Sequence, residues 1–180
     1  MTDLPPRPSG EVPRAGGRLF AAVEVAASLM LGLMVLAILF QVVARYVFAH
    51  PPFWTEELAR YAMIWAGTLG AALAFWYAAD PGFVEPGAVF RGPLARVGAL
   101  VATVPALVFA GMLLYQSLVG PRFDVTRGFV ARNLTRESEA LQVTMAFVAA
   151  AFPVMALLIL IAGALRIAAL LRAGRTRSEE

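Results

Sequence analysis

The residues best suited to chemistry lie in one short segment, residues 53–61, where two carboxylates adjoin the start of an apolar run. Glu56 and Glu57 are adjacent, so on a helix they point about 100° apart and would not flank one substrate bond. A helix cap is one interpretation: Thr55 caps the helix start, the carboxylates occupy its positive first turn, and Glu56 pairs with Arg60. The alternative is contact with a partner or lipid, since carboxylates at a membrane boundary usually have partners.

Other groups needed for catalysis or metal binding are scarce. The chain has no cysteine and a single histidine, His50, which excludes disulfide frameworks, thiolate sites and histidine-rich metal sites. No phosphate-binding glycine loop, zinc-protease motif or nucleophile elbow is present. We therefore expect no catalytic residue, no metal and no cofactor, and we predict that the chain is not an enzyme.

The overall composition is that of a membrane protein. Of 180 residues, 60% are apolar and only 15% are charged, and the mean hydropathy is +0.73. A soluble domain is nearer half apolar and one quarter charged. The pI near 9.9 does not indicate nucleic-acid binding, because the arginines are scattered and border the apolar segments, as they do in membrane proteins.

Four long uncharged runs organise the chain. Each approaches or exceeds the roughly 20 residues that cross a bilayer as a helix. None alternates in polarity as a barrel strand does. The sequence therefore predicts an all-α membrane protein with four transmembrane helices, at about residues 19–48, 54–79, 94–119 and 140–171.

Polar tails flank this transmembrane domain. Residues 1–18 are rich in Pro, Gly and Arg and are expected to form a disordered cytoplasmic tail. The four-helix domain then covers residues 19–172, and residues 173–180 form a second cytoplasmic tail. A cleaved signal peptide is the alternative for the first run, but that run is too long and no clear cleavage site closes it.

Arginine counting predicts the orientation. Nine arginines lie in the two tails and the second loop, and six lie in the first and third loops. The positive-inside rule then places both termini in the cytoplasm. The carboxylate segment would face the opposite side, where we predict a polar cluster of Arg45, Trp54, Glu56, Glu57 and Arg60. Arg45 has a second interpretation, as a side chain that only anchors the first helix at the interface.

The second apolar run carries small residues at every fourth position, which allow another helix to approach closely. These helix-packing candidates are Ala66, Gly70, Ala74 and Ala78. The partner helix could belong to this chain or to another protein. Pro105 and Pro153 lie inside the third and fourth runs, where each removes a backbone hydrogen bond.

The centres of the four runs contain no ionisable residue. A pump, channel or transporter core normally has charge or broken polar backbone there. An autonomous small transporter or channel that acts as an oligomer remains the alternative function. Its pore would depend on the few polar residues within the runs, which are Gln41, Thr68, Thr103, Gln116 and Thr144.

Several segments together resemble one protein family. They are residues 41–48 (QVVARYVF), residues 53–61 (FWTEELARY), residues 139–145 (EALQVTM) and residues 152–154 (FPV). The chain resembles, over about residues 19–170, the small integral-membrane (DctQ-type) subunit of tripartite ATP-independent periplasmic (TRAP) transporters. It departs from many members at residues 80–85, which contain no histidine, so no role is carried over to that loop.

The resemblance implies a supporting role in the bacterial inner membrane. The partners it implies are a large permease subunit, which holds the sodium and substrate sites, and a periplasmic binding protein that delivers an organic acid. The small subunit would act as a scaffold beside the permease, surrounded by membrane lipid. The lack of charge at the centres of the runs is compatible with that role.

Overall fold

The computed structural model describes residues 16–50, 52–77, 93–119 and 124–175, and nearly all of them are helical. The long helices are α1 (Gly17–Val47), α2 (Trp54–Trp76), α4 (Pro93–Leu118) and α7 (Ala151–Arg175). The shorter elements are a 3-10 turn η2 (Val125–Arg127), α5 (Phe129–Arg132) and α6 (Met145–Ala149). The prediction of an all-helical fold is confirmed over the described residues.

Three helical segments of the described chain are long and apolar enough to cross a membrane. They are α1, α2 and the nearly continuous α6–α7 segment Met145–Ala169. The apolar stretch described in α4, Thr103–Leu118, is shorter. The helices therefore have the character of a membrane protein, while the count of four crossings stays a prediction.

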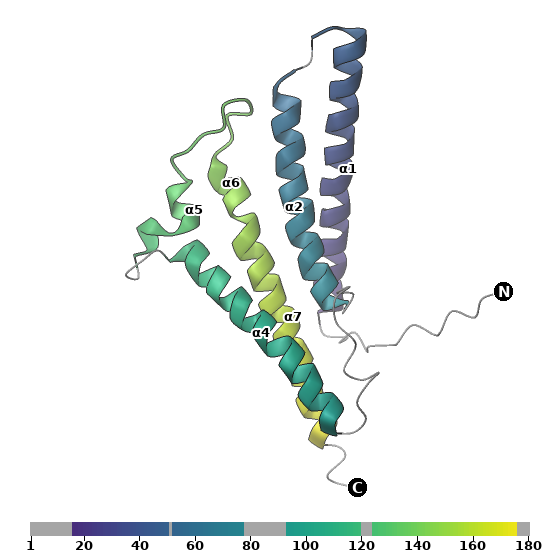
Figure 1. Cartoon of the computed structure of the whole chain (residues 1–180), viewed down its shortest axis with the longest axis vertical. Helices are drawn as coiled ribbons and strands as arrows, with labels where there is room; N and C mark the ends of the chain where they lie inside the picture. The colour runs from purple at the N-terminus through teal and green to yellow at the C-terminus, as the bar shows by residue number, and fades with distance from the viewer. Residues whose placement is uncertain (1–15, 51, 78–92, 120–123, 176–180) are drawn as a thin grey trace, which may run out of the picture.

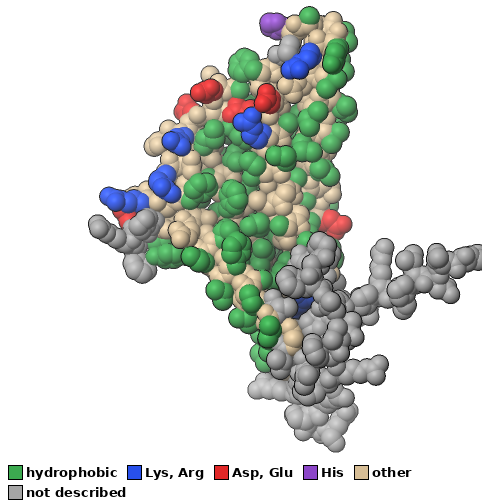
Figure 2. All heavy atoms as spheres, in the orientation of Figure 1, with side chains coloured by type: hydrophobic (Ala, Val, Ile, Leu, Met, Phe, Trp, Pro, Cys, Tyr) green, Lys and Arg blue, Asp and Glu red, His purple; other side chains and the backbone are tan. Residues whose placement is uncertain are grey.

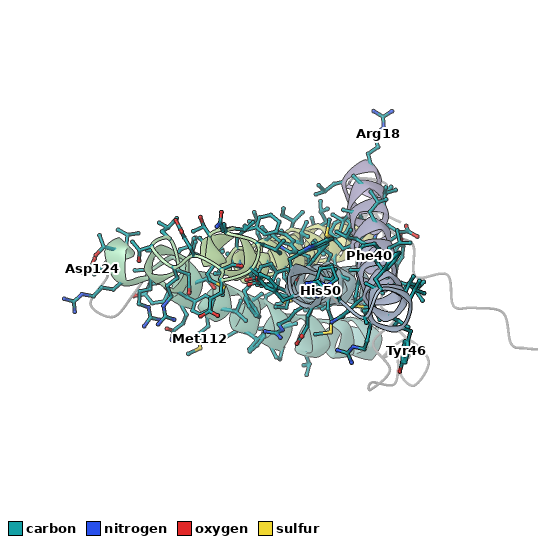
Figure 3. The ribbon with its side chains drawn as sticks, turned by 90° about the horizontal axis from the view of Figure 1, so that it is seen from above. Arg18, Phe40, Tyr46, His50, Met112 and Asp124 are labelled. Carbon is teal, nitrogen blue, oxygen red and sulfur yellow. The ribbon has the colours of Figure 1, made fainter. Side chains whose placement is uncertain are left out.

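The long helices form an open row rather than a closed bundle. α1 packs along α2, α2 packs on α7, and α7 packs on α4 (Figure 1). Seen from above, the row is elongated, with Asp124 near one end and Phe40 and Tyr46 near the other (Figure 3). As a result α1 packs along its length on α2 and meets α7 only near its start. Of its 31 residues, Phe20, Val23, Ala37 and Ala44 are buried.

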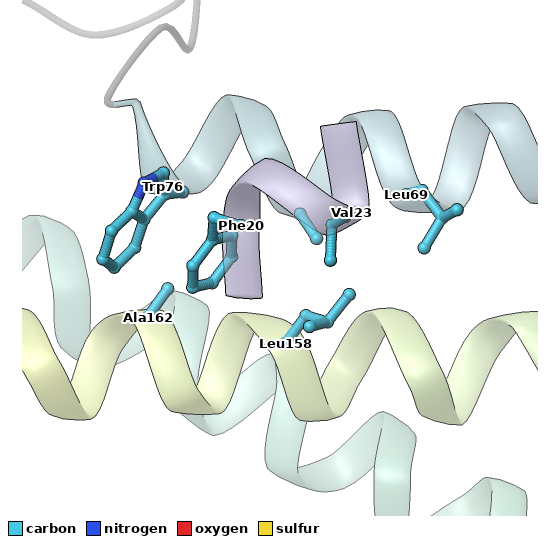
Figure 4. Packing of buried hydrophobic residues seen from close by; sticks show 7 residues of the cluster. Phe20, Val23, Leu69, Trp76, Leu158 and Ala162 are labelled. Carbon is cyan, nitrogen blue, oxygen red and sulfur yellow. The ribbon is translucent and has the colours of Figure 1, made fainter. Parts of the chain in front are cut away.

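Three helices meet in one apolar cluster near the start of α1 (Figure 4). Phe20 of α1 and Trp76 of α2 stack with ring centroids 4.0 Å apart and planes 5° apart. Leu158 and Ala162 of α7 complete this contact. Tyr77, the residue after Trp76, donates a hydrogen bond to Glu24 Oε2 at 3.1 Å, so the carboxylate inside the first apolar run has a polar partner.

The helix of the last predicted span, expected from about residue 140, begins at Met145. Residues 136–145 form a tight hairpin, because the Met145 N–H donates to the Arg136 carbonyl and the Ser138 N–H donates to the Val143 carbonyl. Gln142 has a φ of 53°, which is incompatible with a continuing helix. The helix is then interrupted again at Ala150, where Pro153 has no N–H for the Ala149 carbonyl.

The small-residue face of α2 meets no other helix closely at Gly70. A Cβ built on Gly70 has nothing within 4 Å, and the same holds for Gly67. Ala66 and Ala74 are half-buried, and Ala78 lies outside the described residues. The close helix contact at Gly70 that packing within this chain would require is therefore not seen.

Gly70→Ala is consequently expected to leave the isolated chain as stable as before, or to stabilise it by up to about 1 kcal/mol, because alanine favours helix more than glycine does. The unfolding midpoint of the purified chain in detergent is the measurement. A fall of several degrees would show that a neighbour packs on Gly70.

Candidate functional site

The start of α2 is held by its own backbone turn rather than by a capping side chain. The N-cap residue is Phe53, which has no side-chain cap bond. Thr55 is fully buried and donates its hydroxyl hydrogen to the Pro52 carbonyl at 2.6 Å. The prediction that Thr55 caps the helix is wrong, because Thr55 already lies inside the first turn and its hydroxyl acts as a donor.

Glu56 points outward and forms the predicted pair along the helix. Its Oε1 lies 3.1 Å from Arg60 Nη2, and both side chains are more than half exposed. Exposed pairs at this spacing contribute a few tenths of a kcal/mol.

Glu56→Gln is expected to change the free energy of unfolding by less than about 0.5 kcal/mol, since water replaces the lost pair. Thermal unfolding of the purified variant in detergent checks this. A loss above about 1 kcal/mol would show that Glu56 has a partner beyond Arg60.

Glu57 faces the hairpin at residues 136–145. Its Oε2 accepts the backbone N–H groups of Ala140 and Leu141, each at 3.1 Å. Its Oε1 accepts the hydroxyl of Tyr61, one turn further along α2. This carboxylate therefore joins the start of α2 to the turn that precedes α6.

The backbone of the hairpin turn directs two N–H groups at this carboxylate. Two successive N–H groups converge on one oxygen, which is a common arrangement for binding an anion. Buried Ser138 braces the turn by accepting the Leu141 N–H at 3.1 Å. The oxygen of the same Tyr61 hydroxyl lies 3.4 Å from Met145 Sδ, so Tyr61 also contacts the first residue of α6. The sequence did not indicate these partners, because they lie more than 80 residues from Glu57.

The five residues of the predicted polar cluster are divided among three surroundings. Trp54 lies against α1, with its ring 6.0 Å from that of Phe40. Glu56 and Arg60 face solvent, and Glu57 faces the hairpin. Arg45 is exposed on α1 and has no ion pair with any described carboxylate.

A depression of about 580 Å³ opens between the start of α2 and the hairpin. We call it the polar pocket. Its lining combines arginines, glutamates and an amide with apolar side chains: Phe53, Glu56, Glu57, Arg60, Asn133, Arg136, Glu137, Glu139, Ala140 and Met145. Figure 2 shows acidic and basic side chains gathered at this end of the molecule, above a largely apolar surface.

Residues 128 and 129, which precede the hairpin, pack against α4 and α7. Phe129 of α5 meets Phe152 of α7 edge to face at 6.1 Å. Gly128 lies directly against the end of α4, where a Cβ would come within 2.4 Å of the Leu118 carbonyl oxygen.

Hydrogen bonds from the hydroxyl and N–H of Thr126, with nearby Arg127, hold the pKa of Asp124 below its ordinary value.

The polar contacts described at this end are hydrogen bonds and an ion pair within the chain. Across the described ranges, no group of three or more histidines or carboxylates is placed to hold a metal ion. Glu57 is engaged by backbone and hydroxyl donors of its own chain. Glu57 thus connects the start of α2 to the hairpin before α6, and the charged residues around it lie at the ends of the apolar helices.

These features are those of a helical membrane protein. Its long helices are apolar, they form an open row, and their outer surfaces are left for lipid or other subunits. The profile of a family described as "Tripartite ATP-independent periplasmic transporters, DctQ component" matches residues 34–173. The chain belongs to this DctQ family, whose members are the small membrane subunits of TRAP transporters. They function with a large permease and a periplasmic binding protein. The comparison with curated proteins found no match.

Proposed function

We propose that this chain supports sodium-coupled uptake of an organic acid by holding the static part of its large permease in the membrane. The family assignment supports a place in the transporter. The observation that carries the scaffold role is the exposure of α1, whose apolar window is only 11% buried within this chain. A long apolar helix that packs along its length on one other helix offers a wide face to lipid and to the permease.

In this proposal the chain crosses the inner membrane four times, with both termini in the cytoplasm. α4 supports the fourth crossing, because its 26 residues span about 39 Å as a helix, more than the hydrocarbon layer of about 30 Å. The polar pocket would then face the periplasm. The chain itself would catalyse no reaction and would bind no nucleic acid.

The absence of cysteine makes the topology directly testable. Single cysteines at His50 and Arg132 should react with a membrane-impermeant maleimide in intact spheroplasts. Cysteines at Ser9 and Ser178 should react only after lysis. Labelling of one tail without lysis would contradict the proposed orientation.

Co-purification tests the scaffold role. The tagged permease should retain this chain in mild detergent, and its yield should fall when this chain is not co-expressed. A permease that is made in full amount alone, and that does not retain this chain when both are present, would contradict the proposal.

A further inference from the structure

The charges that line the polar pocket are only partly satisfied within the chain. Glu57 accepts three hydrogen bonds, and Glu56 pairs with Arg60. In the described part of the chain, the side chains of Arg136, Glu137 and Glu139 have no ion pair or hydrogen bond. One cation and two carboxylates therefore remain available to a ligand.

Backbone contacts fix the positions from which these three exposed side chains extend. The Arg136 carbonyl accepts the Met145 N–H at 2.8 Å, and Glu137 bridges to Thr144 in the same hairpin. Glu139 directly precedes the two N–H groups that bind Glu57. The available charges are thus carried by a hairpin backbone that Glu57 already holds in place, which limits the reorganisation of the backbone on binding.

Apolar side chains also line the pocket, and large exposed apolar residues lie on the two helices that begin there. Phe53 and Met145 line the pocket. Phe53 is 75% exposed, and Phe147, two residues beyond Met145, is 52% exposed. The pocket lies where α2 and α6 begin. Trp54, the residue after Phe53, is of the type that is enriched at membrane–water interfaces.

We propose that the polar pocket binds the headgroup of a phospholipid that carries both a phosphate and a primary ammonium, as ethanolamine phospholipids do. Arg136 would bind the phosphate, since guanidinium is the side chain best matched to phosphate oxygens. Glu139 and Glu137 would accept hydrogen bonds from the ammonium. The acyl chains would lie on the apolar surface formed by residues such as Phe53 and Phe147.

The charge pattern favours this lipid over other occupants. A phosphate without an ammonium would leave both carboxylates unpaired beside it. A trimethylated ammonium has no N–H to donate, so it loses the hydrogen bonds that a primary ammonium makes. A soluble zwitterion carries the same charges but gains nothing from the apolar lining.

The test uses the full-length chain, stripped of lipid in detergent. Phospholipids with identical acyl chains and ethanolamine, choline or glycerol headgroups are titrated, and binding is read from native mass spectra and from the unfolding midpoint. We expect one ethanolamine lipid per chain, bound at least about tenfold more tightly than the other two, in line with the strength of charge-assisted hydrogen bonds.

Matched variants assign the roles. Glu139→Gln should remove most of the preference for ethanolamine over choline, whereas Arg136→Gln should weaken binding of all three lipids. Arg132→Gln is the control, because Arg132 is exposed nearby and does not line the pocket. Circular dichroism verifies that each variant remains helical.

Equal binding of the three headgroups, or an equal effect of Arg132→Gln and Arg136→Gln, would overturn the proposal. Glycerophosphoethanolamine without acyl chains should bind far more weakly than the lipid, and equal binding would reassign the pocket to a soluble zwitterion. Loss of the bound lipid when the permease is co-purified would show that a protein segment occupies the pocket instead. None of these results depends on whether the transporter is active.

Discussion

Glu57→Ala is expected to lower the free energy of unfolding by about 2–3 kcal/mol, the largest loss for any single polar group at this end of the molecule. The substitution leaves the N–H groups of Ala140 and Leu141 without their acceptor. It also removes the acceptor of the Tyr61 hydroxyl. The hairpin at residues 136–145 would then lose its connection to α2.

The purified chain in detergent provides the measurement. The unfolding midpoint should fall by roughly 4–10 °C for Glu57→Ala, and backbone amides of the hairpin should exchange faster with deuterium. Glu57→Gln should lie between Glu57→Ala and the wild type, because its carbonyl can accept one of the N–H groups. Glu56→Ala is the matched control, and an equal loss in both alanine variants would contradict the assignment of separate roles to the two carboxylates.

Gly128→Ala is the second substitution with a large expected effect, a loss of about 2–3 kcal/mol from overpacking. The new methyl group would lie 2.4 Å from the Leu118 carbonyl oxygen and 2.7 Å from its carbon. Both are backbone atoms, so no side-chain rotation relieves the overlap. Either α5 or the end of α4 must move, and the contact between Phe129 and Phe152 is expected to loosen with it.

Gly67→Ala is the control for this experiment, because a Cβ on Gly67 meets no atom within 4 Å. It should leave the unfolding midpoint unchanged or raise it slightly. Gly128→Ala should lower the midpoint by several degrees. If the two variants behave alike, the close approach of residue 128 to α4 is not present in the protein.

Local patterns predicted much of this structure. Apolar runs predicted the long helices, and the helix over residues 54–79 was expected to begin at Trp54, where α2 begins. The pair Glu56–Arg60 followed from spacing along one helix. These features depend on neighbours within about four residues, which are visible in the sequence itself.

The features that the sequence did not reveal depend on contacts between distant segments. Nothing near Glu57 indicates that its partners are N–H groups 83 and 84 residues away. The hairpin that delays α6 to Met145 requires Gln142 in a left-handed conformation, which the surrounding turn must impose. No contact in the described part of the chain assigns a role to Arg45 or to Gly70 in the small-residue face of α2, so their place in a subunit interface stays a prediction.

Solute uptake by proteoliposomes tests most directly the central claim, that this subunit supports a permease without moving solute itself. Vesicles would contain the permease with this chain, the permease alone, or this chain alone, each with the binding protein, labelled solute and an inward sodium gradient. We expect rapid uptake only when both membrane subunits are present, and none from this chain alone. Uptake by this chain alone, or full uptake by the permease without it, would contradict the account.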